Sequence, residues 1–483
     1  MNRDPAALQR YVPLLCWTAA LLTVLFICLR IIGYGYLPPG DARRHVAKPF
    51  ACKSYSQIIV MQSGYVVDHS PGWEWLLDKL HRALGWSEDG LMSFSIASLI
   101  LWIFCLPLLW LRRPEAWLAA ILAQLIAQPG LMQRLSQARP YLITDGVLIA
   151  VLLAWSKDGD ENPRWWKVLL TSAGFALSVW MHGAWYLWAL PLAAFFLARR
   201  WRAGLWLTAC WVAGTFAGAL LTGRPVVFLC QEIFVAATIY QEHAPKWMLV
   251  QEFQPSEGEL ATLTLLALVY LWRNGPNKSL RPLFLQPVFW VIAMNWVLGF
   301  FAARFWADWG IPAVLVWLAL QFDDAMPAIA SNSSLKRLMI CGVILVPLFL
   351  DASNDLEQRY TFSLNETFVE AGDPELKGWL PGKDGIFYSD NMTFFYNAFY
   401  KNPQADWRYI VGFEPALMPL EDRKVFRNIR SSNLAAESYM PWINKMRQED
   451  RLVTQRPMQL ALPSLEWKRC GDFWIGRLPL KNN

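Results

Sequence analysis

Apolar runs long enough to cross a lipid bilayer recur along most of this chain of 483 residues. Between Tyr11 and Leu350 we count about eleven runs of roughly 15 to 22 residues, close to the ~20 apolar residues that a membrane-spanning helix needs. Inside a lipid bilayer no water is available to hydrogen-bond the backbone N–H and C=O groups, so these groups must bond to one another. Such runs are therefore predicted to be helices. The predicted spans are residues 12–32, 91–111, 115–131, 140–155, 166–182, 184–198, 203–222, 259–272, 283–303, 309–322 and 336–350. The chain is therefore predicted to be a polytopic α-helical membrane protein.

The composition supports a membrane protein and argues against nucleic-acid binding. Hydrophobic residues make up 55% of the chain and charged residues 17%, whereas soluble domains average about 25% charged residues. The net charge is +6, but Lys and Arg lie in small clusters between the apolar runs, as orientation signals do. Nucleic acid is therefore not an expected partner.

The basic clusters predict the orientation of the chain. Each is separated from the next by two apolar runs, which places all of them, with the N-terminus, in the cytoplasm. Eleven spans then put the C-terminus outside. The clusters are Arg112-Arg113, residues 157–167, Arg199–Arg202, residues 273–281 and Lys336-Arg337. A bacterial inner membrane, with the C-terminal region in the periplasm, and an endoplasmic-reticulum membrane, with that region in the lumen, would give the same topology.

Asp41 directly follows the first span, in the run Gly40-Asp41-Ala42-Arg43-Arg44-His45. A carboxylate at the outer mouth of a span can act as a base at the boundary between lipid and water. A solvated loop charge would have the same sequence. If the carboxylate is partly dehydrated, its pKa is expected to rise, which would make it a better base.

The first outer loop, residues 33–90, carries an amphipathic pattern. Trp73, Leu77 and Leu84 recur at helical spacing, with Glu74 and Arg82 on the other face. This predicts a helix that lies on the membrane surface, or one that packs on an outer domain. The segment 55–61 is a second candidate for an interfacial helix.

Arginines on the outer side are candidates for binding a phosphate, because a guanidinium forms two parallel hydrogen bonds with phosphate oxygens and stays charged. Arg304 is the strongest, since it follows an apolar run near the outer end of a span and orientation does not explain it. Snorkelling to lipid headgroups is the alternative for Arg304, and anionic lipid is the alternative for the pair after Asp41. The candidates are Arg304, Arg139, Arg44 and Arg43.

Further polar residues on the outer side are candidates for binding an acceptor or for supporting the base. Each of them also fits a structural role or a solvated loop position. They are His45, Asp68, His69, His182 and Glu252. No cysteine pair has the spacing of a metal site, so no metal ligand is assigned. Cys52 and Cys470 are expected outside, either as a disulfide or as two free thiols.

Residues 351–483 are more polar than the rest of the chain. Short strands are predicted at 385–389, 407–411 and 473–477, with a helix at 391–400 between the first two. Strand, helix and strand in this order predict a small α/β domain outside the membrane. Residues 1–350 form the predicted transmembrane module.

Several features together resemble the GT-C superfamily of integral membrane glycosyltransferases. They are an Asp just after the first span, amphipathic helices in the first outer loop, many spans and an outer C-terminal domain. The resemblance covers about residues 10–350 and lies in the layout more than in any one motif. Residues 40–41, 68–73, 139–141, 182–186 and 304–305 look similar to segments of bacterial members. The resemblance therefore implies a bacterial inner membrane with a periplasmic C-terminal domain.

The resemblance implies an inverting hexosyl- or pentosyltransferase in which a sugar on a polyprenyl phosphate is the donor and the first-loop Asp is the base. The acceptor would be a hydroxyl group of a glycan, a lipid or a protein. Many members carry two neighbouring acids in this loop, whereas Asp41 is followed by Ala42-Arg43-Arg44-His45. A divalent metal is therefore left open.

Three other functions compete. A transporter or flippase of lipid-linked sugars would show related halves or charged groups at mid-membrane depth, and neither is evident. A non-catalytic assembly protein would leave Asp41 and the outer arginines without a shared purpose. An oligosaccharide polymerase or ligase would use similar residues on a diphosphate lipid.

Overall fold

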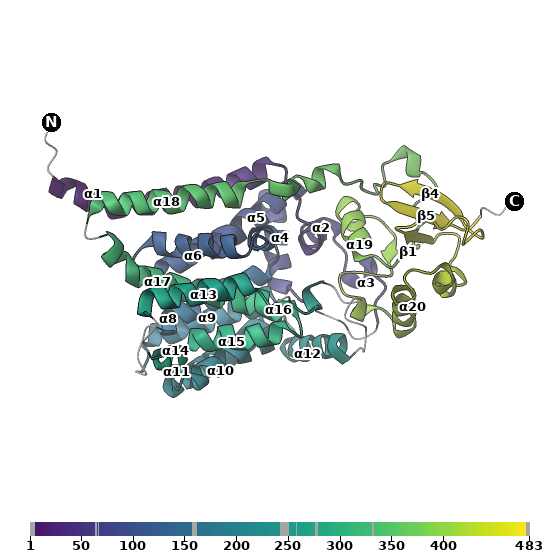
Figure 1. Ribbon diagram of the computed structural model, residues 1–483. Coiled ribbons are helices and arrows are strands. Elements are labelled where there is room, and N and C mark those ends of the chain that lie inside the picture. The colour runs from purple at the N-terminus through teal and green to yellow at the C-terminus, as the bar shows by residue number, and fades with distance from the viewer. Residues whose placement is uncertain are drawn as a thin grey trace.

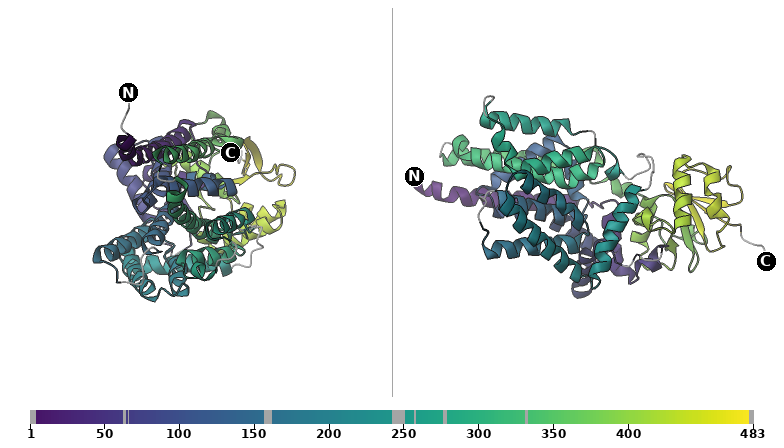
Figure 2. Two further views of the ribbon diagram at one scale, coloured as in Figure 1. Left: turned by 60° about the vertical axis from the view of Figure 1, so that its left-hand side comes forward. Right: turned by 90° about the horizontal axis from the view of Figure 1, so that it is seen from below.

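The computed structural model describes residues 5–62, 65, 67–156, 162–241, 251–256, 258–275, 279–330 and 333–479. A bundle of helices lies side by side along one direction, and a small sheet with its own helices sits at one end (Figure 1). The N-terminus lies at the far end of the bundle and the C-terminus beyond the sheet, as the view from below also shows (Figure 2).

Each of the eleven predicted spans corresponds to a helix, so the prediction of a helical membrane protein is confirmed. These helices are α1 (Pro5–Gly33), α5 (Glu88–Cys105), α6 (Pro114–Ala127), α8 (Tyr141–Ser156), α9 (Trp165–Met181), α10 (Ala189–Leu197), α11 (Trp201–Leu220), α13 (Leu260–Asn274), α15 (Pro287–Gly299), α17 (Ile311–Ala330) and α18 (Ser334–Ser353). Among the described residues, four helical stretches are long and apolar enough to cross a membrane: Tyr11–Gly33, Glu88–Leu109, Trp201–Leu220 and Ala303–Ile329. Six further apolar helices of this part of the chain are 10–17 residues long.

α1 shows how the bundle divides between core and lipid. Ala20, Val24 and Ile27 are fully buried, whereas Leu22 and Phe26 are 44% and 52% exposed. Exposed large apolar side chains along one stripe of a helix need an apolar solvent to cover them. The exposed stripe is therefore the face that α1 presents to lipid.

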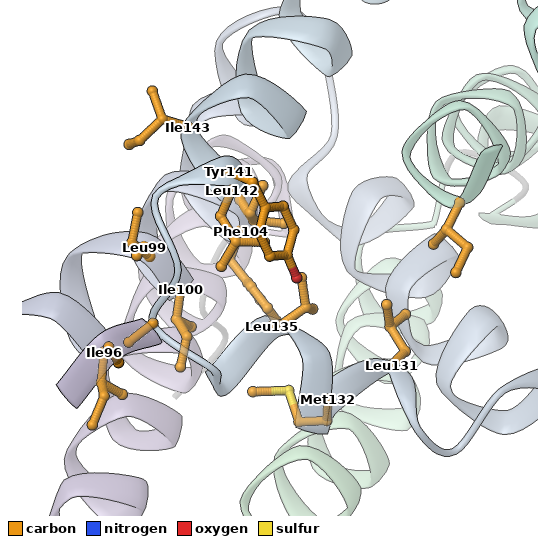
Figure 3. Packing of buried hydrophobic residues seen from close by; sticks show 14 of the residues in the cluster. Ile96, Leu99, Ile100, Phe104, Leu131, Met132, Leu135, Tyr141, Leu142 and Ile143 are labelled. Atoms are coloured by element: carbon orange, nitrogen blue, oxygen red, sulfur yellow. The ribbon is translucent and has the colours of Figure 1, made fainter. Parts of the chain in front are cut away.

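The inner faces of the helices form a close-packed core. Figure 3 shows side chains of α5, α7 (Leu131–Ser136) and α8 meeting in this core. The same hydrophobic cluster continues through the first loop into the C-terminal region, where it includes Phe394 and Phe413. The bundle and the C-terminal region therefore share one core.

The first outer loop differs in part from its prediction. The expected amphipathic helix is α4 (Pro71–Leu84), which buries Trp73 and Leu77. α2 (Asp41–Ala51) was not predicted. The expected interfacial helix at 55–61 is wrong, because only α3 (Tyr55–Ile58) is helical, and Ile59 then forms a parallel bridge with Tyr409 of the C-terminal region.

The C-terminal region forms a five-stranded sheet of order β2-β1-β3-β5-β4 in the described residues. β1 (Ile386–Ser389), α19 (Met392–Lys401) and β2 (Arg408–Tyr409) form the predicted strand, helix and strand, with the two strands parallel. β3 (Arg451–Thr454) is parallel to β1, while β4 (Glu466–Cys470) and β5 (Phe473–Arg477) form an antiparallel hairpin. The predicted small α/β domain is confirmed. Cys52 and Cys470 are both free thiols.

Further elements connect these parts. They are α12 (Pro225–Gln241), α14 (Arg281–Phe284), α16 (Ala303–Phe305), α20 (Leu420–Ser431), α21 (Met440–Ile443), the π-helical turn η5 (Trp306–Gly310), and the 3₁₀ turns η1 (Leu106–Leu109), η2 (Trp185–Trp188), η4 (Gln251–Phe253), η6 (Leu356–Gln358), η7 (Phe362–Asn365), η8 (Pro374–Leu376), η9 (Pro415–Leu417) and η10 (Ala436–Tyr439).

Arg43 joins the first loop to the C-terminal domain. Its side chain is fully buried. Nη1 donates to Glu366 at 2.6 Å and to Asn397 of α19, and Nε donates to the Pro38 carbonyl at 3.0 Å. A buried cation with this many partners is held in one position. Arg43 therefore connects two segments that are more than 300 residues apart in the sequence.

We expect Arg43→Met to lower the free energy of unfolding by about 3 kcal/mol, because the substitution leaves Glu366 without its buried partner. Chemical unfolding in detergent micelles measures this loss. Lys377→Met removes an exposed cation from the same domain and should change the unfolding midpoint little. Equal stability of Arg43→Met and the native chain would show that the pair does not hold the domains together.

Candidate active site

Gly40 fixes the start of α2 and with it the position of Asp41. Its φ of 75° lies in the region that L side chains rarely adopt, and an added Cβ would lie 3.5 Å from Nη2 of Arg139. Asp41 is the first residue of the helix, and its side chain is 32% exposed. The carboxylate faces a cavity between the helix bundle and the C-terminal domain.

Asp41 accepts two hydrogen bonds, from Nε of Arg44 at 3.3 Å and from the hydroxyl of Tyr396 at 3.2 Å. Burial alone would raise the pKa of Asp41, but the positive charges of Arg44 and Arg139 outweigh it and hold the pKa well below its usual range. The expected rise of this pKa is therefore wrong. Asp41 is a firmly ionised carboxylate.

Arg44 lines the cavity but is largely engaged by the protein itself. Its side chain is buried, and Nη1 donates to the Tyr55 hydroxyl at 2.7 Å and to Asp68 at 2.9 Å, with Glu74 at 3.4 Å. The guanidinium also lies 4.0 Å from the ring centroid of Phe413. Such a set of partners makes Arg44 the centre of a network that orients Asp41 and Asp68.

Two histidines and a glutamate form a hydrogen-bonded chain, of which His69 and Glu232 line the cavity. Nδ1 of His69 donates to Glu232 at 2.5 Å, and the Nε2 atoms of His69 and His182 are 2.9 Å apart. Burial lowers the pKa of His69, but Glu232 reverses this effect and the pKa is raised overall. A protonated His69 can donate from both ring nitrogens, which fits an acceptor on each side of it.

Arg304 brings a positive charge to the cavity. Its Nε donates to Asp308 at 3.0 Å, Nη2 lies 3.3 Å from Nε2 of His182, and the guanidinium lies over the ring of Phe253. Asp308 belongs to η5, and it also accepts from Arg134. The anchored Arg304 faces the same cavity as Asp41.

The cavity measures about 1010 Å³ out to its open mouth. It is lined by the first loop, by several helices and turns of the bundle, and by the C-terminal domain. The lining residues are Asp41, Arg44, Tyr65, His69, Ala184, Tyr186, Leu187, Glu232, Val235, Ala236, Phe253, Arg304, Phe305, Trp309, Phe413, Glu414 and Leu417. Many of them are apolar, so charged groups stand on an otherwise hydrophobic wall.

The structure brings some predicted residues together at the cavity and places others behind it. Those that line it are Asp41, Arg44, His69 and Arg304; those that do not are Arg139, Arg43, His45, Asp68, His182 and Glu252. Arg139 and Glu252 pair with each other. Arg43 points into the domain interface and does not line this cavity.

Several residues in or beside the cavity could not be predicted from the sequence. Glu232 lies in the apolar sequence of α12, and its being the one acidic residue of that helix was the only indication of a functional role. Tyr396, Phe413 and Glu414 belong to the C-terminal domain, and no local pattern could indicate that they reach the first loop. Among the residues that the structure describes, no group of three His, Cys, Asp or Glu side chains is placed to hold a metal ion.

The architecture is similar to that of two solved membrane glycosyltransferases. ArnT from Cupriavidus metallidurans bound to undecaprenyl phosphate matches with a TM-score of 0.56 and 12% identity, over 97% of this chain and 98% of that chain. Its apo state matches with 0.57 and 13%, over 96% and 97%. The archaeal oligosaccharyltransferase AglB from Archaeoglobus fulgidus, in complex with an inhibitory peptide and a dolichol-phosphate, gives 0.56 and 11%, over 92% and 70%.

No protein-family model matches the chain, and no curated protein matches its sequence. At 11–13% identity the likeness establishes the fold. The chain has the GT-C fold, as the sequence resemblance implied.

His45 should make the stability of the protein depend on pH. Burial and the neighbouring Arg44 lower the pKa of His45 to about 3, so the folded state keeps it neutral while the unfolded chain protonates below about 6.5. Its contribution is present above pH 6.5 and is lost as the pH falls towards 3. As the pH is lowered from 6.5 towards 3, the free energy of unfolding of the native chain should therefore decrease by about 1.4 kcal/mol per pH unit more than that of His45→Gln.

Urea unfolding in micelles at several pH values between 4 and 7 measures this difference. His81→Gln, on α4 outside the cavity, is the matched control and should follow the native chain. Parallel curves for His45→Gln and the native chain would contradict the neutral, buried His45.

Proposed function

We propose that this chain is a membrane glycosyltransferase that moves a sugar from a polyprenyl-phosphate donor to an acceptor hydroxyl, with Asp41 as the base. One observation carries the proposal: an ionised carboxylate and an anchored guanidinium, Asp41 and Arg304, face one cavity that opens where the helix bundle meets the C-terminal domain. The GT-C fold, shared with two glycosyltransferases, supports it.

Arg304 is proposed to bind the donor phosphate. Its hydrogen bond to Asp308 and its contact with His182 fix the guanidinium in place. A preorganised cation stabilises the negative charge that develops on a leaving phosphate. Arg44 adds to the positive potential of the cavity, although most of its N–H groups already donate to the protein. Arg139 does not line the cavity, but its positive charge acts on Asp41 and Glu252.

The apolar part of the wall suits a lipid-linked substrate. Leu187, Val235 and Phe305 line the cavity together with the charged groups. The polyprenyl chain would lie along such a surface, while the sugar phosphate reaches the polar end. Because α1 and other helices expose apolar stripes, a donor can approach from the bilayer.

The reaction needs the acceptor hydroxyl to lose its proton as its oxygen bonds to the anomeric carbon. Asp41 is ionised and partly exposed, so it can accept a hydrogen bond from that hydroxyl and take the proton during transfer. The bond from the anomeric carbon to the phosphate oxygen breaks, and its electron pair stays on the phosphate facing Arg304. Attack from the side opposite the phosphate inverts the anomeric centre.

The remaining predicted residues support this site. His69, His182 and Asp68 hold the groups that line the cavity, and His45 is a buried neutral neighbour of Arg44. We propose a bacterial inner membrane with a cytoplasmic N-terminus, a periplasmic C-terminal domain and α4 at the outer membrane surface. The acceptor is a hydroxyl of a glycan, a lipid or a protein.

Asp41→Asn should reduce sugar transfer by about 100-fold or more, because the amide has no basic oxygen to take the proton. Purified protein with radiolabelled polyprenyl-phosphate sugars and a membrane extract as the source of acceptor measures transfer. Asp351→Asn, at the end of α18 away from the cavity, serves as the control. Full activity of Asp41→Asn would exclude Asp41 as the base. If the native chain moved lipid-linked sugar across vesicle membranes without any sugar transfer, a transporter would be favoured.

Arg304→Gln should weaken binding of polyprenyl phosphate by about tenfold or more, because charge-assisted hydrogen bonds contribute about 1.5–3 kcal/mol each. Arg134→Gln is the matched control, since Arg134 also pairs with Asp308 but does not line the cavity. Binding is measured with short-chain polyprenyl phosphate in micelles. Equal affinity of the Arg304→Gln variant and the native chain would exclude Arg304 from the phosphate site.

A further inference from the structure

Glu414 lies on the loop that carries the C-terminal domain to the cavity. It follows Phe413, whose ring covers the guanidinium of Arg44, and precedes η9. Its side chain is half-buried and lines the same cavity as Asp41. The domain therefore contributes a carboxylate of its own to the proposed reaction site.

Backbone hydrogen bonds hold this loop in place on both sides of Glu414. The Val60 amide donates to the Tyr409 carbonyl at 2.8 Å, and the Gln62 amide donates to the Leu417 carbonyl at 2.8 Å. Between them Gly412 lies against Ile59, where an added Cβ would come within 2.8 Å of the side chain. Glu414 is therefore held by the first loop, the same segment that carries Asp41.

Tyr396 links the loop that carries Glu414 to Asp41. Its hydroxyl lies 3.2 Å from Oδ1 of Asp41 and 3.5 Å from the carbonyl oxygen of Phe413, the residue before Glu414. One hydroxyl group thus contacts both the first-loop carboxylate and the backbone of the loop. The two carboxylates face one space from opposite sides of the domain boundary.

The three carboxylates of the cavity differ in their partners. Asp41 is paired with Arg44, and Glu232 with His69. Glu414 makes no hydrogen bond or ion pair through its carboxylate with any residue that the structure describes. Its carboxylate is therefore open to a substrate or a proton.

The charges around the two carboxylates push their proton affinities apart. Burial and the negative charge of Asp41 raise the pKa of Glu414 to about 7, against a smaller opposite effect of His69, Arg304 and Arg44. Among the described residues, the charged and titratable groups that share the cavity with Glu414 are Asp41, Arg44, Tyr65, His69, Tyr186, Glu232 and Arg304, and Tyr396 lies beside them on Asp41. A pair of carboxylates separated in this way divides the roles of acid and base between its members.

We propose that Glu414 receives, through Asp41, the proton that leaves the acceptor hydroxyl during sugar transfer. The inference rests on the proposed glycosyltransferase function. The O–H bond of the acceptor breaks as its oxygen bonds to the anomeric carbon, and the proton passes from Asp41 to the Glu414 carboxylate, which then releases it to solvent. The phosphate leaves with the electron pair of the glycosidic bond.

This role predicts how activity depends on pH. Glu414 can take up a proton only as a carboxylate, so kcat should rise with pH with a midpoint near 7. In Glu414→Gln this rise should disappear, and kcat at pH 8 should fall about 100-fold. Glu414→Asp keeps the carboxylate and should keep the rise. Glu421→Gln, an exposed acid of α20 in the same domain, is the matched control and should behave as the native chain.

The assay uses the full chain in micelles with polyprenyl-phosphate sugar, at pH 5.5 to 9, with binding of polyprenyl phosphate measured in parallel. An infrared titration of the carboxyl groups, without substrate, should show one group that ionises near pH 7 in the native chain and in Glu421→Gln but not in Glu414→Gln.

Each outcome is decisive. If the native chain transfers sugar and Glu414→Gln keeps the rise with pH, Glu414 is not the proton acceptor, while the proposed function stands. A normal kcat with a raised KM for the acceptor would also overturn the role, since it would make Glu414 a binding group only. If Glu414→Gln does not fold, absence of the ionisation near pH 7 in the native chain overturns the inference. Absence of any transfer by the native chain overturns both proposals.

Discussion

The buried guanidinium of Arg44 is the interaction on which the site depends. Tyr55, Asp68 and Glu74 surround it from the first loop, and Phe413 covers it from the C-terminal domain. A buried cation is costly unless its partners are all in place, so this network admits one arrangement of the first loop. Asp41 takes its position and its charge from that arrangement. The orientation of the proposed base is thus a consequence of packing between segments far apart in the sequence.

The helices of the bundle could be predicted because an apolar run is a local signal. The same holds for α4 and for the β1-α19-β2 unit, because each of these elements shows its pattern of apolar and polar residues within its own short segment. α2 could not be predicted, since its charged sequence indicates a solvated loop and only distant partners make its burial favourable. The extended conformation after Ile58 could not be predicted either, because the hydrogen-bonding partners of this segment lie some 350 residues further along the chain.

The site could be predicted in kind but not in detail. Asp41 and Arg304 were identified from their place at the ends of spans, and both line the cavity. Arg43 stands beside Arg44 in the sequence, yet successive residues of a helix point in different directions, and Arg43 faces the domain interface. The pKa of Asp41 was expected to rise with burial, but the sign of a pKa shift depends on neighbours as well as on water. Those neighbours are known only once the fold is known.

The pairing of Val60 and Gln62 with the loop around Glu414 has a consequence for how the protein is made. The first outer loop is synthesised long before residues 409–417, so at first Arg43 has only its partners within the loop, without Glu366 and Asn397, and the segment after Ile58 has no strand to pair with. The cavity is complete only when residues 409–417 have been synthesised. A product truncated before them would hold its full set of predicted spans and yet lack one wall of the cavity.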